Sequence, residues 1–137
     1  MAVFFSDSRE QTIEIAKNFA KTLQAGDTVL LCGDMGAGKT VFSKGVALGL
    51  EIFEEVTSPT YAYMNEYEGE NFTLYHYDCY RIESIEQAEN LGLGEYFYMG
   101  GVCLVEWSQN ISALLPERVI RVNIKKVGED KREIEII

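Results

Sequence analysis

Residues 33–40 carry the groups with the clearest chemistry in this chain. They are Gly-Asp-Met-Gly-Ala-Gly-Lys-Thr and fit the phosphate-loop pattern G-x-x-x-x-G-K-[ST]. In such a loop the backbone N–H groups cradle phosphate oxygens, and the following helix adds positive partial charge at its N-terminus. Lys39 would reach the β- and γ-phosphates, and the Thr40 hydroxyl would bind Mg²⁺. The pattern predicts a nucleotide site; a glycine-rich turn with a solvated lysine is the weaker alternative.

Two acidic residues end strand-like stretches elsewhere in the chain. Asp78 ends residues 72–78, and Glu106 ends the apolar residues 102–106. Ligands of open α/β sheets bind at the carboxyl ends of parallel strands, so both carboxylates are expected near the phosphates. Glu106 is the candidate for holding Mg²⁺ or its water shell, whereas Asp78 could equally cap a turn or helix. His76, the only histidine, is expected to be a hydrogen-bonded packing residue.

The periodicity of apolar residues predicts the elements that position these groups. Helices are expected after the capping boxes at residues 8–11 and 84–87 and after the phosphate loop. The first helix should end at Gly26 and carry on one face Ile13, Ala16, Phe19, Ala20 and Leu23. Strands are expected at residues 2–5, 28–32, 61–67, 72–78, 102–107, 118–124 and 131–137.

Two of the predicted strand pairs are hairpins. Residues 61–67 and 72–78 form one, and its tyrosines are expected to pack across the strands rather than to stack on bases. Residues 118–124 and 131–137 form the other, which should add antiparallel strands to the sheet.

The composition fits one globular domain spanning residues 1–137. Apolar residues make up 47% of the chain, no apolar run approaches a membrane span, and the N-terminus does not have the pattern of a secretory signal. The three cysteines, Cys32, Cys79 and Cys103, suit neither a disulfide framework nor a metal knuckle. They are predicted to be reduced thiols of a cytoplasmic protein, with Cys32 and Cys103 in the core.

The net charge of −10 is unevenly distributed. Residues 51–99 carry eleven acidic side chains and a single basic one, Arg81. A protein that binds nucleic acid unaided usually has the opposite sign. The segment is therefore predicted to be a solvated acidic surface or, as the sharper alternative, a docking face for a basic protein partner.

Other nucleotide-dependent classes fit the sequence less well. A GTPase would carry a base-reading Asn-Lys-x-Asp motif after the acidic strand, and residues 108–111, Ser-Gln-Asn-Ile, do not provide one. Adenine is therefore favoured over guanine. A small-molecule kinase normally has a substrate domain and a lid, for which 137 residues is short.

Several motifs follow one another at consistent spacing along nearly the whole chain. They are the phosphate loop, Ser58-Pro59-Thr60-Tyr61, His76-Tyr77-Asp78-Cys79-Tyr80-Arg81, and Leu104-Val105-Glu106-Trp107 followed by Leu115-Pro116. Together they resemble the TsaE (YjeE) family of small bacterial ATPases, which are required for the threonylcarbamoyl modification of the adenosine next to the tRNA anticodon. The resemblance implies a P-loop NTPase-like, three-layer α/β fold in which antiparallel strands flank a central parallel sheet.

The resemblance also assigns roles to particular residues. It implies a weak ATPase with Mg²⁺ at Thr40 and Glu106, Asp78 orienting the attacking water, and residues 58–61 sensing the nucleotide. Thr12 would lie near the nucleotide, and Arg132 would lie near the adenine. The residues implied to contact ATP are Thr12, Asp34, Met35, Gly36, Ala37, Gly38, Lys39, Thr40, Val41 and Arg132. Val41 and Cys79 depart from the usual threonine and leucine of the family without removing a group that the chemistry needs.

The implied partner is the TsaD–TsaB complex, which transfers the threonylcarbamoyl group. The ATPase would reset that complex between turnovers and would meet tRNA only through it, with no membrane involved and the protein a monomer when alone. Two alternatives remain. One is a protein-binding module that is switched by ATP binding, with hydrolysis incidental, and the other is a small P-loop kinase.

Overall fold

A computed structural model describes residues 1–34, 36–57, 59 and 63–137. The described strands are β1 (Ala2–Ser6), β2 (Thr28–Cys32), β3 (Met64–Glu68), β4 (Thr73–Asp78), β5 (Val102–Glu106), β6 (Ile120–Lys126) and β7 (Arg132–Ile136). The α-helices are α1 (Arg9–Ala20), α2 (Lys39–Gly49) and α3 (Ile85–Asn90), and 3₁₀ segments occupy η1 (Glu95–Tyr98) and η2 (Ser108–Leu114). No helix within these ranges is long and apolar enough to cross a membrane.

The strands form one seven-stranded sheet in the order β1-β7-β6-β2-β5-β4-β3. Strands β6, β2, β5 and β4 are mutually parallel at its centre, and β1, β7 and β3 pair antiparallel at its sides. This arrangement confirms the predicted fold class. The prediction for the terminal hairpin was wrong in one respect: β6 runs parallel to β2 and is antiparallel only to β7.

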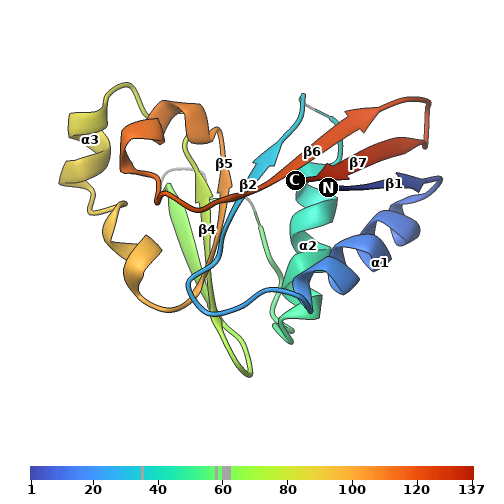
Figure 1. The fold of residues 1–137 in the computed structure, drawn as a ribbon, viewed down its shortest axis with the longest axis horizontal. Helices are drawn as coiled ribbons and strands as arrows, with labels where there is room; N and C mark the ends of the chain where they lie inside the picture. Colours follow the sequence, from blue (N-terminus) through green and yellow to red (C-terminus); the bar gives the residue numbers. More distant parts are fainter. Residues whose placement is uncertain (35, 58, 60–62) are drawn as a thin grey trace.

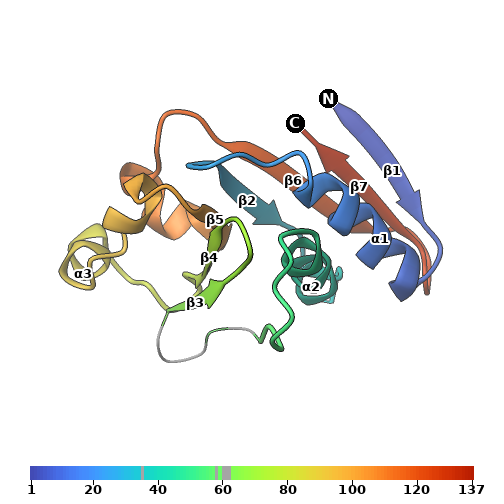
Figure 2. The same ribbon diagram turned by 90° about the horizontal axis from the view of Figure 1, so that it is seen from below.

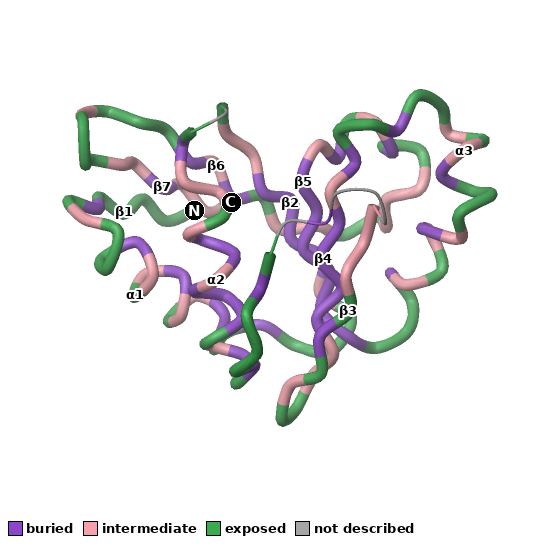
Figure 3. The backbone as a smooth tube through the Cα atoms, turned by 180° about the vertical axis from the view of Figure 1, so that it is seen from behind, coloured by how far each residue is buried: buried purple, intermediate pink, exposed green. Residues whose placement is uncertain are grey.

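Helical layers cover both faces of the sheet, but at different ends (Figures 1 and 2). Helices α1 and α2 pack together on one face, where the rings of Phe19 and Phe42 lie 5.9 Å apart. On the other face, α3, η1 and η2 lie over β4 and β5, and Tyr77 stacks on Phe97 with a centroid distance of 5.1 Å. The buried residues concentrate on β2, β4 and β5 between the two layers (Figure 3).

Both predicted capping boxes begin helices. The Ser8 hydroxyl accepts a hydrogen bond from the Gln11 N–H and begins α1, and Ser84 does the same for Gln87 at α3. The predicted end of the first helix was wrong, because α1 stops at Ala20. Gly26 instead lies in the turn before β2, at φ +88°, and its N–H donates to Gly101 O.

The hairpin of β3 and β4 is confirmed within the described residues, which exclude residues 61 and 62 of its predicted first strand. The predicted packing of its tyrosines across the two strands was wrong for Tyr75 and Tyr77, although both rings are buried. Tyr67 and Tyr75 are buried, and the Tyr77 hydroxyl donates to Leu93 O at 2.6 Å. Because Tyr75 packs on Tyr96 and Tyr77 on Phe97, their main ring contacts are with η1 rather than with the neighbouring strand.

The three cysteines divide into two fully buried thiols and one that is partly exposed. Cys79 and Cys103 are buried, whereas Cys32, which was also predicted to lie in the core, is only half-buried at the end of β2. Burial raises the pKa of the Cys79 and Cys103 thiols to about 12. Because the thiolate is the reactive form, both should be inert at ordinary pH.

A thiol-labelling experiment tests this division. At pH 8 a disulfide reagent such as DTNB should modify only Cys32 in the folded protein and all three cysteines in denaturant. The Cys32→Ser variant, as the control, should release no thiol until it unfolds. Rapid reaction of a second thiol in the folded protein would contradict the burial of Cys79 or Cys103.

Candidate functional site

Three parallel strands end side by side at the candidate site. The register pairs Leu31 of β2 with Glu106 of β5, and Glu106 with Asp78 of β4. The carboxyl ends of β2, β5 and β4 therefore form one row across the sheet. The phosphate loop continues from β2 at this row, so both predicted carboxylates lie beside it.

The loop between β2 and α2 needs its glycines for specific geometric reasons. Gly38 precedes α2 with φ +110°, a backbone conformation that side chains disfavour. Gly33 lies against β6, where an added Cβ would come within 2.7 Å of Ile124 O. Met35, one of the predicted contacts, lies outside the described residues. The strand, loop and helix thus have the order that a phosphate loop requires.

Glu106 carries a carboxylate in a largely buried position. The residue is 7% exposed, and its Oε2 lies 3.0 Å from Nε2 of His76. Its Oε1 lies 3.9 Å from Nζ of Lys39, at the outer limit of an ion pair. His76 was predicted to be a hydrogen-bonded packing residue, and it is buried and hydrogen-bonded; what the sequence did not reveal is that its partner is Glu106.

Lys39 lies between this carboxylate and an aromatic ring. Its Nζ is 5.0 Å from the centre of the Trp107 ring, a cation–π distance. Trp107 takes this place in a left-handed backbone conformation, φ +57°, directly after β5, and its ring contacts Tyr80 at 4.8 Å. Trp107 therefore packs beside the site, with its ring next to the lysine of the phosphate loop.

Asp78 combines the two roles that the sequence left open. Its Oδ1 accepts a hydrogen bond from the Tyr80 N–H at 3.1 Å and so caps the turn after β4. The residue is nevertheless only half-buried, and it lines the same cleft as Lys39 and Glu106. A turn-capping carboxylate thus also faces the space in front of the phosphate loop.

A cleft of about 420 Å³ joins most of the predicted site residues. Its lining consists of Gly36, Gly38, Lys39, Thr40, Val41, Asp78, Glu106, Trp107 and Arg132. No group of three or more His, Cys, Asp or Glu side chains in the described ranges could hold a metal unaided. The exposed Thr40 hydroxyl and the Glu106 carboxylate are hard oxygen donors, which fit Mg²⁺ because this ion commonly takes one or two protein ligands together with phosphates and water.

A smaller hollow of about 200 Å³ adjoins the cleft and shares Gly38, Val41 and Arg132 with it. Thr12 lines this hollow from α1. Thr12 is buried, unlike an ordinary surface residue in the first turn of a helix, and its hydroxyl lies 2.6 Å from that of Ser6. The two hollows together extend from the phosphate loop to the first helix, where Thr12 was expected to meet a nucleotide.

Arg132 connects the phosphate loop to the C-terminal hairpin. Its Nε donates to Ala37 O at 2.7 Å, and a terminal nitrogen lies 3.5 Å from Gly36 O. The other terminal nitrogen donates to the carbonyls of Glu129 and Lys131. Arg132 was expected near an adenine; it lines both hollows, but its hydrogen bonds go to the backbone of the loop and of the β6–β7 turn.

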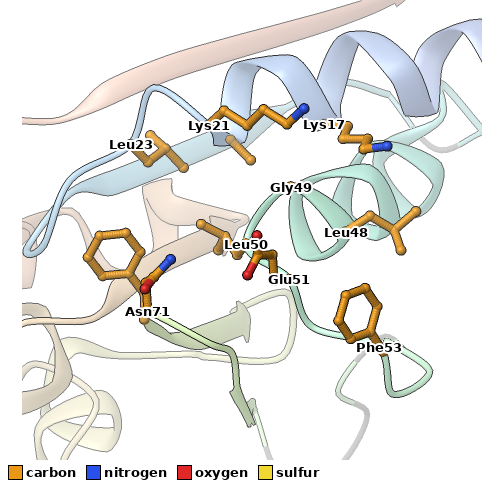
Figure 4. Close-up of a pocket in the computed structure, with 11 residues that line it drawn as sticks. Lys17, Lys21, Leu23, Leu48, Gly49, Leu50, Glu51, Phe53 and Asn71 are labelled. Carbon is orange, nitrogen blue, oxygen red and sulfur yellow. The ribbon is translucent and has the colours of Figure 1, made fainter.

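A further hollow lies away from this cleft. It has a volume of about 470 Å³ and opens between the C-terminal ends of α1 and α2 and the β3–β4 turn (Figure 4). Its labelled charged residues are Lys17, Lys21 and Glu51. Helix α2 separates it from Lys39 by roughly 15 Å, since ten residues rise 1.5 Å each. It contributes nothing to the cleft at the phosphate loop.

Comparisons with known proteins agree on one family. The family described as "Threonylcarbamoyl adenosine biosynthesis protein TsaE" matches residues 6–134. The curated TsaE protein of Bacillus subtilis is 48% identical over 125 residues, covering 91% of this chain and 78% of that protein. The TsaE protein of Treponema pallidum is 39% identical over 131 residues, covering 96% of both chains. The crystal structure of Bacillus subtilis YdiB superposes with a TM-score of 0.79 at 40% identity, covering 97% of this chain and 82% of that one.

The contacts of Arg132 predict that it supports the phosphate loop. Replacing it in the Arg132→Ala variant removes the hydrogen bonds to Ala37 O and Gly36 O. Hydrogen bonds from a charged group contribute about 1.5–3 kcal/mol, so the affinity for a nucleoside triphosphate should fall by about tenfold or more. Titration of a fluorescent ATP analogue measures this affinity.

The neighbouring Lys131→Ala variant is the matched control, because it removes a positive charge from the same turn and leaves the bonds from Arg132 to the loop in place. It should bind the analogue with nearly unchanged affinity. Equal losses in the two variants would show that charge in the turn, rather than the contact with the loop, is what matters.

Proposed function

This chain belongs to the TsaE family, and from that premise we propose that it binds ATP with Mg²⁺ in the cleft at the phosphate loop and hydrolyses it to ADP and phosphate. The hydrolysis would serve the threonylcarbamoyladenosine modification of tRNA, the process for which its relatives are named. The observation that carries the proposal is the convergence of Lys39, Asp78 and Glu106 on one cleft from three separate stretches of the chain.

The positions of these residues suggest a division of work. Lys39 at the start of α2 would bind the β- and γ-phosphates, together with the backbone N–H groups of the loop. Thr40 and Glu106 would hold Mg²⁺, which when bound offsets negative charge on the phosphates. Asp78 lies next to Glu106 in the register and would orient the water that attacks the γ-phosphorus as ADP leaves.

A protein partner is supported by the surface of the molecule. Ten of the eleven acidic residues in residues 51–99 are exposed, and Asp78 is the exception because it lines the cleft. An acidic surface of this kind is better suited to a basic protein than to tRNA itself. We therefore propose the TsaD–TsaB complex as the partner and contact with tRNA only through that complex, as the family resemblance implies.

Replacing Asp78 with asparagine tests the proposed hydrolysis most directly. The Asp78→Asn variant keeps a side-chain oxygen that can accept the Tyr80 N–H, so the turn should persist while the carboxylate is lost. ATP turnover should fall by roughly 10²-fold or more, and the affinity for ATP should change little. Phosphate release, measured with and without TsaD–TsaB from the same source, gives the turnover.

Lys39→Ala is the negative control, because it removes the proposed phosphate contact and should abolish stimulation by the partner complex. Unchanged turnover in Asp78→Asn would contradict the role of Asp78. A variant that binds ATP without hydrolysing it, yet supports repeated rounds of tRNA modification, would instead favour a nucleotide-gated binding module.

A further inference from the structure

The position of His76 is not explained by packing alone. Its side chain is almost completely buried, with 1% exposed, yet it is polar and makes a contact with a charged group. His76 and Asp78 are two residues apart on β4, so both side chains leave the same face of the strand. Asp78 lies directly opposite Glu106 in the register, and His76 reaches diagonally to the same carboxylate.

The direction of the hydrogen bond follows from the chemistry of the two groups. An ionised carboxylate can only accept, so His76 Nε2 carries the proton and donates to Glu106 Oε2. The other ring nitrogen, Nδ1, is buried and has no hydrogen-bond partner within the part of the chain that the structure describes. Among the described residues, the hydrogen bond to Glu106 is therefore the polar contact that orients the His76 ring.

The two oxygens of Glu106 have different neighbours. Oε2 accepts from His76 at 3.0 Å, whereas Oε1 lies 3.9 Å from Lys39 Nζ. A carboxylate free to rotate would close on the lysine, since two unit charges about 4 Å apart attract by roughly 4 kcal/mol near a protein surface. A tight Lys39–Glu106 pair would withdraw both groups from phosphate and metal. The hydrogen bond from His76 opposes that rotation.

We propose that His76 is a positioning residue that fixes the Glu106 carboxylate, keeps it from closing on Lys39 and thereby maintains its affinity for Mg²⁺. This inference rests on the proposed function, because it assumes that Glu106 is a Mg²⁺ ligand. Groups that hydrogen-bond a metal's ligands typically change metal affinity by 10–100-fold when they are replaced.

Three variants separate positioning from a structural role. His76→Leu fills the buried space without a donor, and His76→Gln keeps an N–H at a similar reach. Tyr77→Phe is the matched control. It removes the buried hydrogen bond from the Tyr77 hydroxyl to Leu93 O, and Tyr77 lies on the same strand as His76 but on its opposite face. The readouts are urea unfolding and the Mg²⁺ concentration that half-saturates the binding of a fluorescent ATP analogue.

We expect His76→Leu to raise the half-saturating Mg²⁺ concentration by roughly 10–100-fold, with little change in analogue binding without Mg²⁺. His76→Gln should restore most of the Mg²⁺ affinity, and Tyr77→Phe should lose stability without losing Mg²⁺ affinity. If His76→Leu and Tyr77→Phe both lose stability and both keep the wild-type Mg²⁺ dependence, the role of His76 is structural only and the proposal is overturned.

A measurement without nucleotide or Mg²⁺ keeps this inference separate from the proposed function. His76 is the only histidine in the chain, so protein made without a histidine tag gives a single pair of imidazole ¹⁵N signals. These should report a proton on Nε2 in the wild type and should shift in Glu106→Ala. Unchanged signals would overturn the hydrogen bond. If the signals shift in Glu106→Ala but the wild-type protein shows no Mg²⁺-dependent binding of the ATP analogue, the proposed function is overturned instead. The hydrogen bond would then stand, but the role proposed for it in Mg²⁺ binding would not.

Discussion

The buried carboxylate of Glu106 is the constraint on which the arrangement of this site depends. Removing an ionised carboxylate from water costs several kcal/mol unless hydrogen bonds and opposite charge compensate. Here the compensation comes from two directions, His76 on β4 and Lys39 on α2. Both can reach Glu106 only because β4, β5 and β2 are parallel neighbours that end in one row. The order of the strands therefore determines which groups stabilise the buried carboxylate in the cleft.

A second constraint links the phosphate loop to the C-terminal hairpin. The phosphate loop is shaped by Gly38 in a left-handed conformation and by the close approach of Gly33 to β6. Backbone carbonyls in a loop have no ladder partners and need other hydrogen-bond donors. Arg132, almost a hundred residues away, supplies them to Ala37 and Gly36. The C-terminal hairpin thus supports the loop as well as extending the sheet.

The sequence predicted the parts of the site that follow from local pattern. The loop is a contiguous motif, and Asp78 and Glu106 each end a recognisable strand. The contacts that join these parts were not predictable in the same way. Arg132 bonds to backbone carbonyls, which every residue possesses, and His76 meets Glu106 across thirty positions through a strand order that no local pattern encodes. The side chains of a strand alternate between the two faces of the sheet whether its neighbours are parallel or antiparallel. The sequence pattern of β6 therefore did not reveal that β6 runs parallel to β2.

The charges in the cleft bear on how a nucleotide and a cation would bind together. Asp78 and Glu106 are neighbours in the row, and both lie beside the loop that would hold a polyanionic triphosphate. Lys39, which lies 3.9 Å from Glu106, brings one positive charge against two carboxylates and a triphosphate, so it cannot neutralise them all. A divalent cation between the carboxylates and the phosphates converts their repulsion into attraction. The residues that would make the cleft hydrolytic would therefore also make a cation part of nucleotide binding, and the proposed fixing of Glu106 by His76 would set how strongly the two are coupled.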